Sequence, residues 1–440
     1  MKGVFFTYLL TAYGCVAGIF WPVYGAFAYF ALSILKPRAL WFWSVPFREY
    51  TLWVGTCTLI GWGLSGFGRR DHLSFMKLAL VCIVGFVGWQ WLSLIMHGRW
   101  NDPWLRYHCE TISKDMLMII VVLTLVTSFK HLRIFTYVVI MATGYLAYEM
   151  NYAYVIQNWN RLWIREFAGV DNNGMAMVFA MTVPLMIAVG AFEKDWRLKL
   201  LAWAWIPFNI HAVQFSFSRT GMLGLFTCIP FVAVLLPRKL RTASMLAVVT
   251  AGGLWMAGPS VRDRFSSIFL DREQLDASAR SRYVTWAAGW KCMNENPFLG
   301  VGPRCFNRVS RDYGLSGGKS IHNLFLQIGA DLGFPGMFLL IGIYAGTMIA
   351  LLWNRRLRSG YSPWYPYWSG GIVAGLATSV ICSQFIGMER VEMPYMLCAI
   401  GLAAVKVALM EQASPEMRMK EAAADVILPE EAPVKALPAT

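Results

Sequence analysis

A histidine stands before an interrupted apolar run late in the chain, in "GGKSIHNLFLQIGADLGFPGM" (Gly317 to Met337). Asn323, Gln327 and Asp331 recur at every fourth position, which places them on one face of a helix, away from its apolar stripe. We expect Pro335-Gly336 to turn the chain from this helix into its next membrane span. His322 lies at the N-terminal end of this helix, where the positive dipole lowers the pKa of an imidazole. The pattern favours a neutral histidine that takes a proton from a hydroxyl over a structural histidine.

An arginine stands at the tip of a very short hairpin between two apolar segments, in "FSFSRTGMLG" (Phe215 to Gly224). An arginine at membrane depth is costly unless it snorkels to the surface or faces an internal cavity. Ser218 and Gly221 allow close approach of a ligand to the backbone beside it. Arg219 is therefore a candidate anion-binding residue, with a snorkelling arginine as the alternative.

A second arginine leads an aromatic helical face in "SARSRYVTWAAGWKCMNENPFLGVGP" (Ser278 to Pro303). Arg282, Trp286 and Trp290 are spaced by four and share one face. A helix of this kind lies along a membrane surface and aims its guanidinium at a phosphate. Arg280 precedes it on the same segment as a further candidate contact, and the alternative is an amphipathic helix with solvated arginines.

A third polar group opens an apolar segment in "FAGVDNNGMAMVF" (Phe167 to Phe179). Asp171, Asn172 and Asn173 form either an Asx cap for a membrane helix or a cluster that faces a substrate at the lipid–water boundary. Taken together, the arginines suit a diphosphate leaving group and the histidine suits an attacking hydroxyl. This combination predicts transfer chemistry on a lipid-linked phosphorylated donor, with no cofactor and no metal, because no carboxylate cluster suggests one.

Composition determines which elements position these residues. The chain has 440 residues, of which 57% are hydrophobic and 15% charged, with a mean hydropathy of +0.48. Soluble domains are more charged and less apolar, and the apolar blocks here have the length of membrane-spanning helices. The sequence predicts an all-α polytopic membrane bundle of about 12 spans. The first block, 3–36, is too long for one span, and Pro22 is the expected break.

Charges in the short loops predict the orientation of the bundle. The net charge of +14 is partly topological, because short cytoplasmic loops carry excess Lys and Arg. Counting spans places five basic loops on one side, at Arg69-Arg70, Lys130/Arg133, Lys194/Arg197/Lys199, Arg238-Lys239/Arg241 and Arg355-Arg356/Arg358. The predicted divisions are membrane helices in 1–258, a long outer loop with amphipathic helices in 259–333, the last membrane helices in 334–409, and a disordered cytoplasmic tail in 410–440. Cys292 and Cys305 share the long loop, and whether they pair stays open.

These stretches resemble the O-antigen ligase/polymerase family of bacterial membrane glycosyltransferases. The resemblance is carried by "DNNGMA", "SFSRTG", Arg282 to Trp286 with "NPFLGVGP", and "HNLFLQIGADLGFPG", and it covers residues 165–355 well. It implies a bundle of the GT-C type that transfers glycan from undecaprenyl diphosphate at the periplasmic face of the inner membrane. The acceptor in the family is lipid A–core, a growing glycan or a protein. The N-terminal "FAYFALSILKPRALWFW" looks more like an exosortase-associated glycosylation ligase branch, which leaves the acceptor open.

The resemblance also implies roles for individual residues. Arg219 and Arg282 match the family's essential arginines, and His322 matches its histidine in the long loop. Asn173 falls where the family often has an asparagine. Further substrate contacts are expected from Asp171, Arg280, Trp286 and Asn323. Two functions from other classes remain as alternatives, a glycolipid flippase or exporter and a non-catalytic scaffold for envelope assembly; a repeat or a central intramembrane charge pair would favour the exporter.

Overall fold

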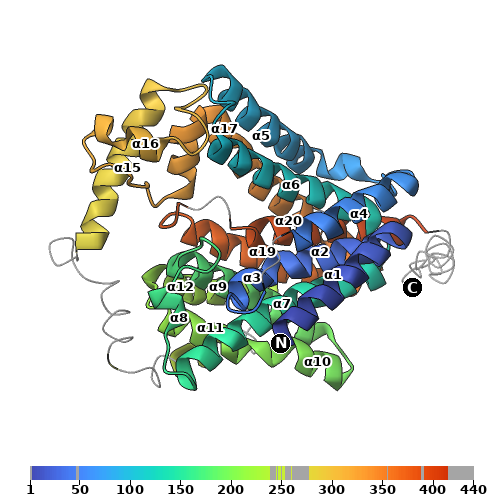
Figure 1. Cartoon of the computed structure of the whole chain (residues 1–440). Coiled ribbons are helices and arrows are strands. Elements are labelled where there is room, and N and C mark those ends of the chain that lie inside the picture. The colour runs from blue at the N-terminus through green and yellow to red at the C-terminus, as the bar shows by residue number, and fades with distance from the viewer. Residues whose placement is uncertain are drawn as a thin grey trace, which may run out of the picture.

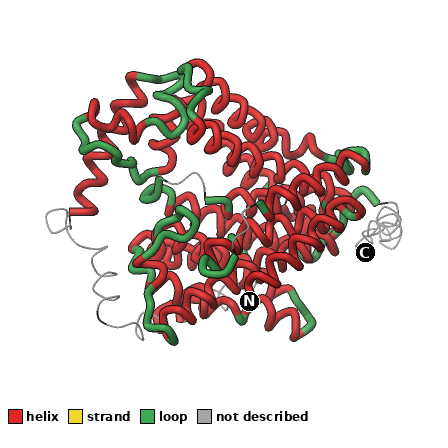
Figure 2. The backbone as a smooth tube through the Cα atoms, in the orientation of Figure 1, coloured by secondary structure: helices red, strands yellow, loops and turns green. Residues whose placement is uncertain are grey.

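The computed structural model describes residues 2–45, 49–237, 277–353, 355–387 and 391–414, with a few isolated residues between 244 and 259. Within these residues the chain is helical, and the one strand-like feature is a single antiparallel bridge between Phe167 and Val170. Figures 1 and 2 show helices packed side by side in a bundle. The predicted all-α class is confirmed, and the tail beyond residue 414 lies outside the described residues.

The helices of the first half are α1 (Lys2–Phe20), α2 (Pro22–Leu35), α3 (Pro37–Leu40), α4 (Tyr50–Leu64), η1 (Leu73–Met76), α5 (Lys77–Met96), α6 (Pro103–Leu125), α7 (Phe129–Val155) and α8 (Arg161–Ile164). Those of the second half are α9 (Asn172–Phe192), α10 (Trp196–Trp203), α11 (Trp205–Phe215), α12 (Arg219–Leu235), α15 (Ala277–Glu295), α16 (Phe306–Val309), η4 (Ser310–Tyr313), α17 (Leu324–Leu352), α18 (Arg355–Tyr361), α19 (Tyr365–Cys382) and α20 (Met393–Gln412).

The first apolar block divides where the sequence predicts. Helix α1 ends at Phe20 and α2 begins at Pro22, and both helices pack against α4. The hairpin is tight because glycines meet near its turn: a Cβ on Gly25 would lie 2.3 Å from the Gly18 Cα. Proline lacks the amide hydrogen that a continuous helix needs, so the break falls there. The second piece belongs to the bundle rather than to the membrane surface.

Among the described residues, five helices are long and apolar enough to cross a membrane, namely Lys2–Phe20, Leu73–Met96, Asn172–Phe192, Leu324–Leu352 and Met393–Gln412. Within an apolar stretch of 18 residues in each helix, the buried share is 89% in α9 and 94% in α20, but 33% in α1. Helices α9 and α20 are therefore central in the bundle, and α1 is peripheral. Several other helices are shorter than a simple span. The total of about 12 spans therefore stays a prediction.

One end of the bundle gathers the basic loops. Lys406 on α20 donates from Nζ to the carbonyl oxygens of Arg69 at 2.7 Å and of Leu123 at 2.8 Å. Arg133 forms an ion pair with Glu193, which joins the start of α7 to the end of α9. Phe129 stacks on Trp364 and Arg355 donates to the Leu235 carbonyl, so the start of α19 and the end of α12 lie there too. Four of the five predicted basic loops thus share one end, and Arg238 to Arg241 lie outside the described residues.

The opposite end carries a lobe built from the long loop. Helices α15 and α16 and the first part of α17 stand together at the upper left of Figure 1. Their common core contains Ala288, Cys292, Phe306, Ile321 and Ala330. Cys292 and Cys305 are both buried and free, and each packs in a different apolar cluster.

Helix α17 turns inside its own length at a glycine. Gly333 has φ 73°, and a Cβ there would lie 2.2 Å from the Phe298 carbonyl oxygen. The next amide, of Phe334, donates to the Pro297 carbonyl at 2.8 Å. Only glycine combines a positive φ with this close approach. The turn therefore falls at Gly333, and not at Pro335-Gly336, where the sequence places it.

Candidate active site at the outer end of the bundle

Helices α9, α12 and α17 begin at capped N-termini that lie near one another, on the end of the bundle opposite the basic loops. The Oδ1 atom of Asp171 accepts from the Gly174 amide at 2.8 Å and opens α9. Ser218 does the same for α12, with its Oγ 3.1 Å from the Gly221 amide. Asn323 opens α17 by accepting from the amides of Phe325 and Leu326 at 3.1 Å. Short polar side chains cap helices in this way because they satisfy amides that have no partner inside the helix.

Side chains join the starts of α9 and α12 directly. The Ser218 hydroxyl donates to Asn173 Oδ1 at 2.7 Å, and Asn172 Nδ2 donates to the Ser216 carbonyl at 2.9 Å. Asn173 also donates to Asp171 Oδ2 at 3.3 Å. Arg219, the first residue of α12, is half-buried beside these contacts. Residues 171–173 and 216–219, separate in sequence, therefore form one polar cluster.

The segment after α19, Cys382 to Gly387, brings α17 to this cluster. The Leu324 amide donates to the Ser383 carbonyl at 2.8 Å, and Asn323 Nδ2 donates to Gln384 Oε1 at 3.2 Å. Cys382 Sγ in turn lies 3.4 Å from the Thr220 carbonyl of α12. The start of α17 is thus joined through this segment to the start of α12.

The second arginine reaches the same segment from α15. The Arg282 Cζ lies 5.8 Å from the ring centre of Phe385, and Trp286 packs on that ring at 6.0 Å. Thr285, between them in sequence, donates to the Ile321 carbonyl at 3.1 Å. Helix α15 is therefore fixed against the residue that precedes His322. The predicted common face of Arg282 and Trp286 lies against Phe385 rather than against open water.

His322 is a half-buried side chain with a lowered pKa. Burial is the largest cause, because a charged imidazole loses hydration there. The positive charge of Arg282 lowers the pKa further, while the negative charge of Asp171 opposes the shift, so both charges act on the ring. The imidazole is therefore neutral at pH 7 and able to accept a proton.

Backbone strain accompanies all three caps. Ala168, Phe217 and His322 have φ of 55°, 53° and 53°, in the left-handed region that side chains disfavour. Phe217 and His322 directly precede the caps of α12 and α17, and Ala168 lies in the turn before the cap of α9. Each such residue costs about 1–3 kcal/mol, and strain of this kind gathers at functional sites.

The electrostatic character of this end is positive. Helix N-termini present partial positive charge and free amide hydrogens, which suit an anion. Arg219 and Arg282 add two full charges, and the carboxylate of Asp171 offsets part of one. Within the described residues, no group of three His, Cys, Asp or Glu side chains is placed to hold a metal ion.

The structure brings most of the predicted site residues to one end of the bundle. His322, Arg219, Arg282, Asp171 and Trp286 lie around residues 382–387, as the contacts above describe. Asn173 and Asn323 lie there as well, with their side chains engaged in a helix-to-helix contact and a cap. The backbone of Arg280 is part of α15, and its side chain lies outside the described residues.

The polar face of α17 serves the interior of the lobe. Asp331 is 1% exposed, and its Oδ1 accepts from the Phe306 amide at 2.7 Å. Gln327 donates to Asp331 Oδ2 at 2.8 Å and accepts from the Ile321 amide at 3.0 Å. The predicted polar face of α17 is present in the structure. Its side chains link the interior of the lobe to Ile321, the residue next to His322.

The sequence reasoning missed Gln384 and Phe385. Both lie in "CSQFIG" (Cys382 to Gly387), where Ser383 and Gln384 interrupt an otherwise apolar stretch. A half-buried amide at the end of an apolar helix favours a hydrogen-bond partner, and here Gln384 accepts from Asn323. The need of this amide for a partner was the signal in the sequence that could have identified Gln384.

Comparison with known proteins agrees with this geometry. The family model described as O-Antigen ligase matches residues 206–341. The matched segment includes Arg219, Arg282 and His322, whereas Asp171 and residues 382–387 lie outside it. No curated protein matches the chain. Residues 206–341 are therefore similar to the O-antigen ligase family, and the match does not extend to the rest of the chain.

Proposed function

We propose that this protein transfers a glycan from an undecaprenyl-diphosphate-linked donor to an acceptor at the periplasmic face of the bacterial inner membrane. The family supports glycan transfer of the O-antigen ligase or polymerase type. The observation that carries the proposal is the meeting of three capped helix N-termini with Arg219, Arg282 and His322. This end is opposite the basic loops, which is the expected side for a periplasmic site.

The two arginines bind the diphosphate of the donor. A diphosphate carries several negative charges, and guanidinium groups hold phosphate oxygens through paired N–H donors. The amides at the first turns of α9, α12 and α17 add partial positive charge in the same region. Charge that develops on the leaving oxygen is stabilised in this environment without a metal ion.

His322 acts on the acceptor. Its neutral imidazole takes the proton of the acceptor hydroxyl as that oxygen attacks the anomeric carbon of the donor sugar. The new C–O bond forms while the bond between the anomeric carbon and the diphosphate breaks, and the electron pair leaves with undecaprenyl diphosphate. Attack from the side opposite the leaving group inverts the configuration at that carbon.

The family leaves the acceptor open among lipid A–core, a growing glycan and a protein. The same donor site serves a ligase, a polymerase and a protein O-oligosaccharyltransferase, including the exosortase-associated branch. The exporter alternative expects a charge pair in the middle of the membrane. The ion pair between Lys36 and Glu392 lies instead at the ends of α2 and α20, so it gives the exporter no support.

Donor binding and product stereochemistry test the proposal. Purified full-length protein is titrated with undecaprenyl diphosphate, and Arg219→Gln and Arg282→Gln are compared with wild type. We expect each substitution to weaken binding by about ten-fold or more, since a charge-assisted contact contributes roughly 1.5–3 kcal/mol. Arg106→Gln is the control, because Arg106 is exposed and pairs with Glu110 on its own helix. Equal affinity in all four proteins, or a product that retains the donor's anomeric configuration, contradicts the mechanism.

A further inference from the structure

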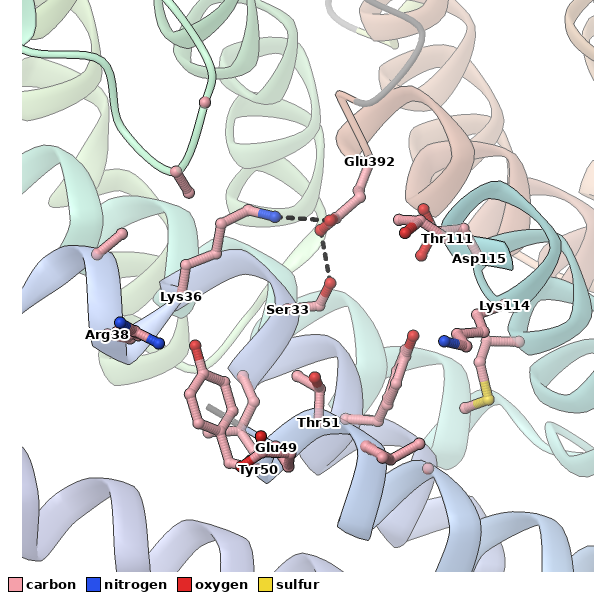
Figure 3. Close-up of a pocket in the computed structure, with 18 of the residues that line it drawn as sticks. Ser33, Lys36, Arg38, Glu49, Tyr50, Thr51, Thr111, Lys114, Asp115 and Glu392 are labelled. Carbon is pink, nitrogen blue, oxygen red and sulfur yellow. Dashed lines mark hydrogen bonds and ion pairs between the residues drawn. The ribbon is translucent and has the colours of Figure 1, made fainter. Parts of the chain in front are cut away.

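A cavity of about 1160 Å³ lies between α2, α3, α4, α6 and the start of α20. Figure 3 shows Lys36 and Arg38 on one side of this space and Lys114 and Asp115 on the other. None of its lining residues belongs to the segment matched by the family model, residues 206–341. The cavity therefore belongs to the part of the chain that differs from the family's common domain.

Arg161 is the most informative residue in its lining. Its side chain is 5% exposed, and within the described residues it has no carboxylate in ion-pair range. Its guanidinium donates to the Ala39 carbonyl and lies 5.6 to 5.7 Å from the ring centres of Phe42, Trp159 and Phe167. Burial is the largest cause that lowers the pKa of Arg161 to about 10; the negative charge of Glu149 opposes the shift and Arg165 adds to it.

Other cations surround Arg161 at the same side of the cavity. Arg165 lies over the Phe42 ring with its Cζ 4.1 Å from the ring centre. Lys36 lies 2.6 Å from Glu392, whose second oxygen accepts from the Ser33 hydroxyl at 2.5 Å. Glu392 is thus fully engaged, and the guanidinium of Arg161 remains the buried charge that a ligand's anion can neutralise. Glu49, Asp115 and Glu166 also line the cavity and limit its net positive charge.

The remaining wall combines polar residues such as Thr51, Thr111 and Lys114 with a set of apolar side chains that reaches the outside of the bundle. Leu32, Leu59 and Met118 line it from three helices. Leu52 on α4 and Leu117 on α6 line it too, yet they are 55% and 37% exposed. A chamber with the buried Arg161 and the half-buried Lys36 at one end and exposed apolar side chains at another suits a molecule with an anionic head and a hydrocarbon tail.

The cavity also borders the proposed active site. Ala168 and Gly169 line it, and they form the turn closed by the bridge between Phe167 and Val170. The next residue, Asp171, caps α9 in the catalytic cluster. One short turn therefore separates the cavity from the site where His322 would meet an acceptor hydroxyl.

We propose that this cavity binds the acceptor, which is an amphiphile whose phosphate or carboxylate lies against Arg161 while its chain lies against Leu52 and Leu117. Calling this ligand the acceptor rests on the proposed function. The inference goes beyond that function by naming the binding site and the class of ligand. An anionic phospholipid of the bilayer shares this chemistry, so the experiment separates the two sources. On this proposal, residues 206–341 act on the donor, and the N-terminal helices select the acceptor.

Native mass spectrometry of the full chain in detergent tests the inference. The probes are a phosphorylated glucosamine disaccharide lipid, its dephosphorylated form, phosphatidylglycerol and phosphatidylcholine. Two variants disturb the cavity by different routes: Arg161→Gln removes the charge, and Thr56→Trp fills the space from an exposed lining position. Arg106→Gln is the matched control, because Arg106 does not line the cavity.

We expect wild type and the control to bind the phosphorylated glycolipid at least ten-fold more tightly than its dephosphorylated form. Both cavity variants lose that preference and keep their affinity for undecaprenyl diphosphate, which shows that the donor site is intact. Unchanged glycolipid binding in both variants overturns the site. Phosphatidylglycerol that binds in an Arg161-dependent manner and is not displaced by the glycolipid overturns the assignment to the acceptor. Loss of undecaprenyl diphosphate binding in Arg161→Gln and Thr56→Trp overturns it as well, because the cavity would then belong to the donor.

The outcomes separate this inference from the proposed function. If glycan transfer occurs while both cavity variants bind the probe as wild type does, the inference alone fails. If the cavity binds the phosphorylated probe as expected and no glycan transfer is found, the proposed function fails and the binding site stands.

Discussion

Gln327 is held by Asp331 and in turn holds the backbone beside His322. Its Nε2 donates to Asp331 Oδ2 at 2.8 Å, and its Oε1 accepts from the Ile321 amide at 3.0 Å. Both side chains are buried, at 1% exposure each. Because His322 has a positive φ, the backbone around it needs such support to keep its geometry.

Replacing Gln327 by leucine therefore disturbs the position of His322 without touching substrate. We expect kcat to fall about 10–100-fold while donor affinity changes little, since small displacements of a catalytic group affect the transition state most. Asn294→Ala is the control: its side chain donates to the Trp290 carbonyl on the exposed side of the same lobe. A variant whose donor KM rises with no change in kcat would show that Gln327 does not position the base.

Arg282 and Asp171 set the acid limb of the pH profile through His322. Burial and Arg282 lower the pKa of His322 and Asp171 raises it, so the neutral base persists below pH 6.5. Activity is therefore lost as the pH falls through that lowered pKa. In kcat/KM against pH, Arg282→Gln should move the acid limb to higher pH, and Asp171→Asn should move it to lower pH. If the acid limb of the pH profile moves in the same direction in both variants, the assignment of that limb to His322 is wrong.

The contact between Ser218 and Asn173 fixes α12 against α9. Substituting Asn173 by alanine removes the acceptor of the Ser218 hydroxyl and costs about 1 kcal/mol. We expect a modest loss of thermal stability in detergent and a larger loss of transfer activity, because Arg219 follows Ser218 directly. Thr227→Ala is a matched control on α12, since its hydroxyl bonds only within that helix. Equal losses of activity in both variants would mean that the contact has no special role.

Lys406 tests the packing at the opposite end. Its ammonium donates to the carbonyls of Arg69, Leu123 and Thr124, within 3.1 Å of each. Lys406→Met removes this donor from all three carbonyls; Thr124 keeps the Arg69 amide as a partner, and an unsatisfied buried acceptor costs about 1–3 kcal/mol. We expect a clear drop in the detergent melting temperature, against little change for the variant Lys194→Met, because Lys194 is exposed. A Lys406→Met protein as stable as wild type would show that these contacts do not hold α20.

The sequence predicts the helical class and the break at Pro22 because hydropathy and proline act locally. It also offers an Asx cap at residues 171–173 as one of two interpretations, because short polar residues before an apolar run often cap helices. The cap at Asn323 was not predicted, since that residue was expected to contact substrate. The turn at Gly333 was misplaced because Pro335-Gly336 gives the stronger local signal, whereas the contact that requires glycine comes from distant Phe298. Gln384, Phe385 and Arg161 were missed for the same reason: each matters through partners remote in sequence.

The most direct test reconstitutes the purified chain with an undecaprenyl-diphosphate-linked glycan and candidate acceptors, and compares wild type with His322→Ala. The account predicts that wild type forms a new glycosidic bond and releases undecaprenyl diphosphate. His322→Ala should lose about 10²–10⁴-fold in transfer rate, the usual contribution of a general base, while it still binds the donor. A His322→Ala protein as active as wild type, or a wild type that moves the donor across vesicles without forming a new bond, contradicts it.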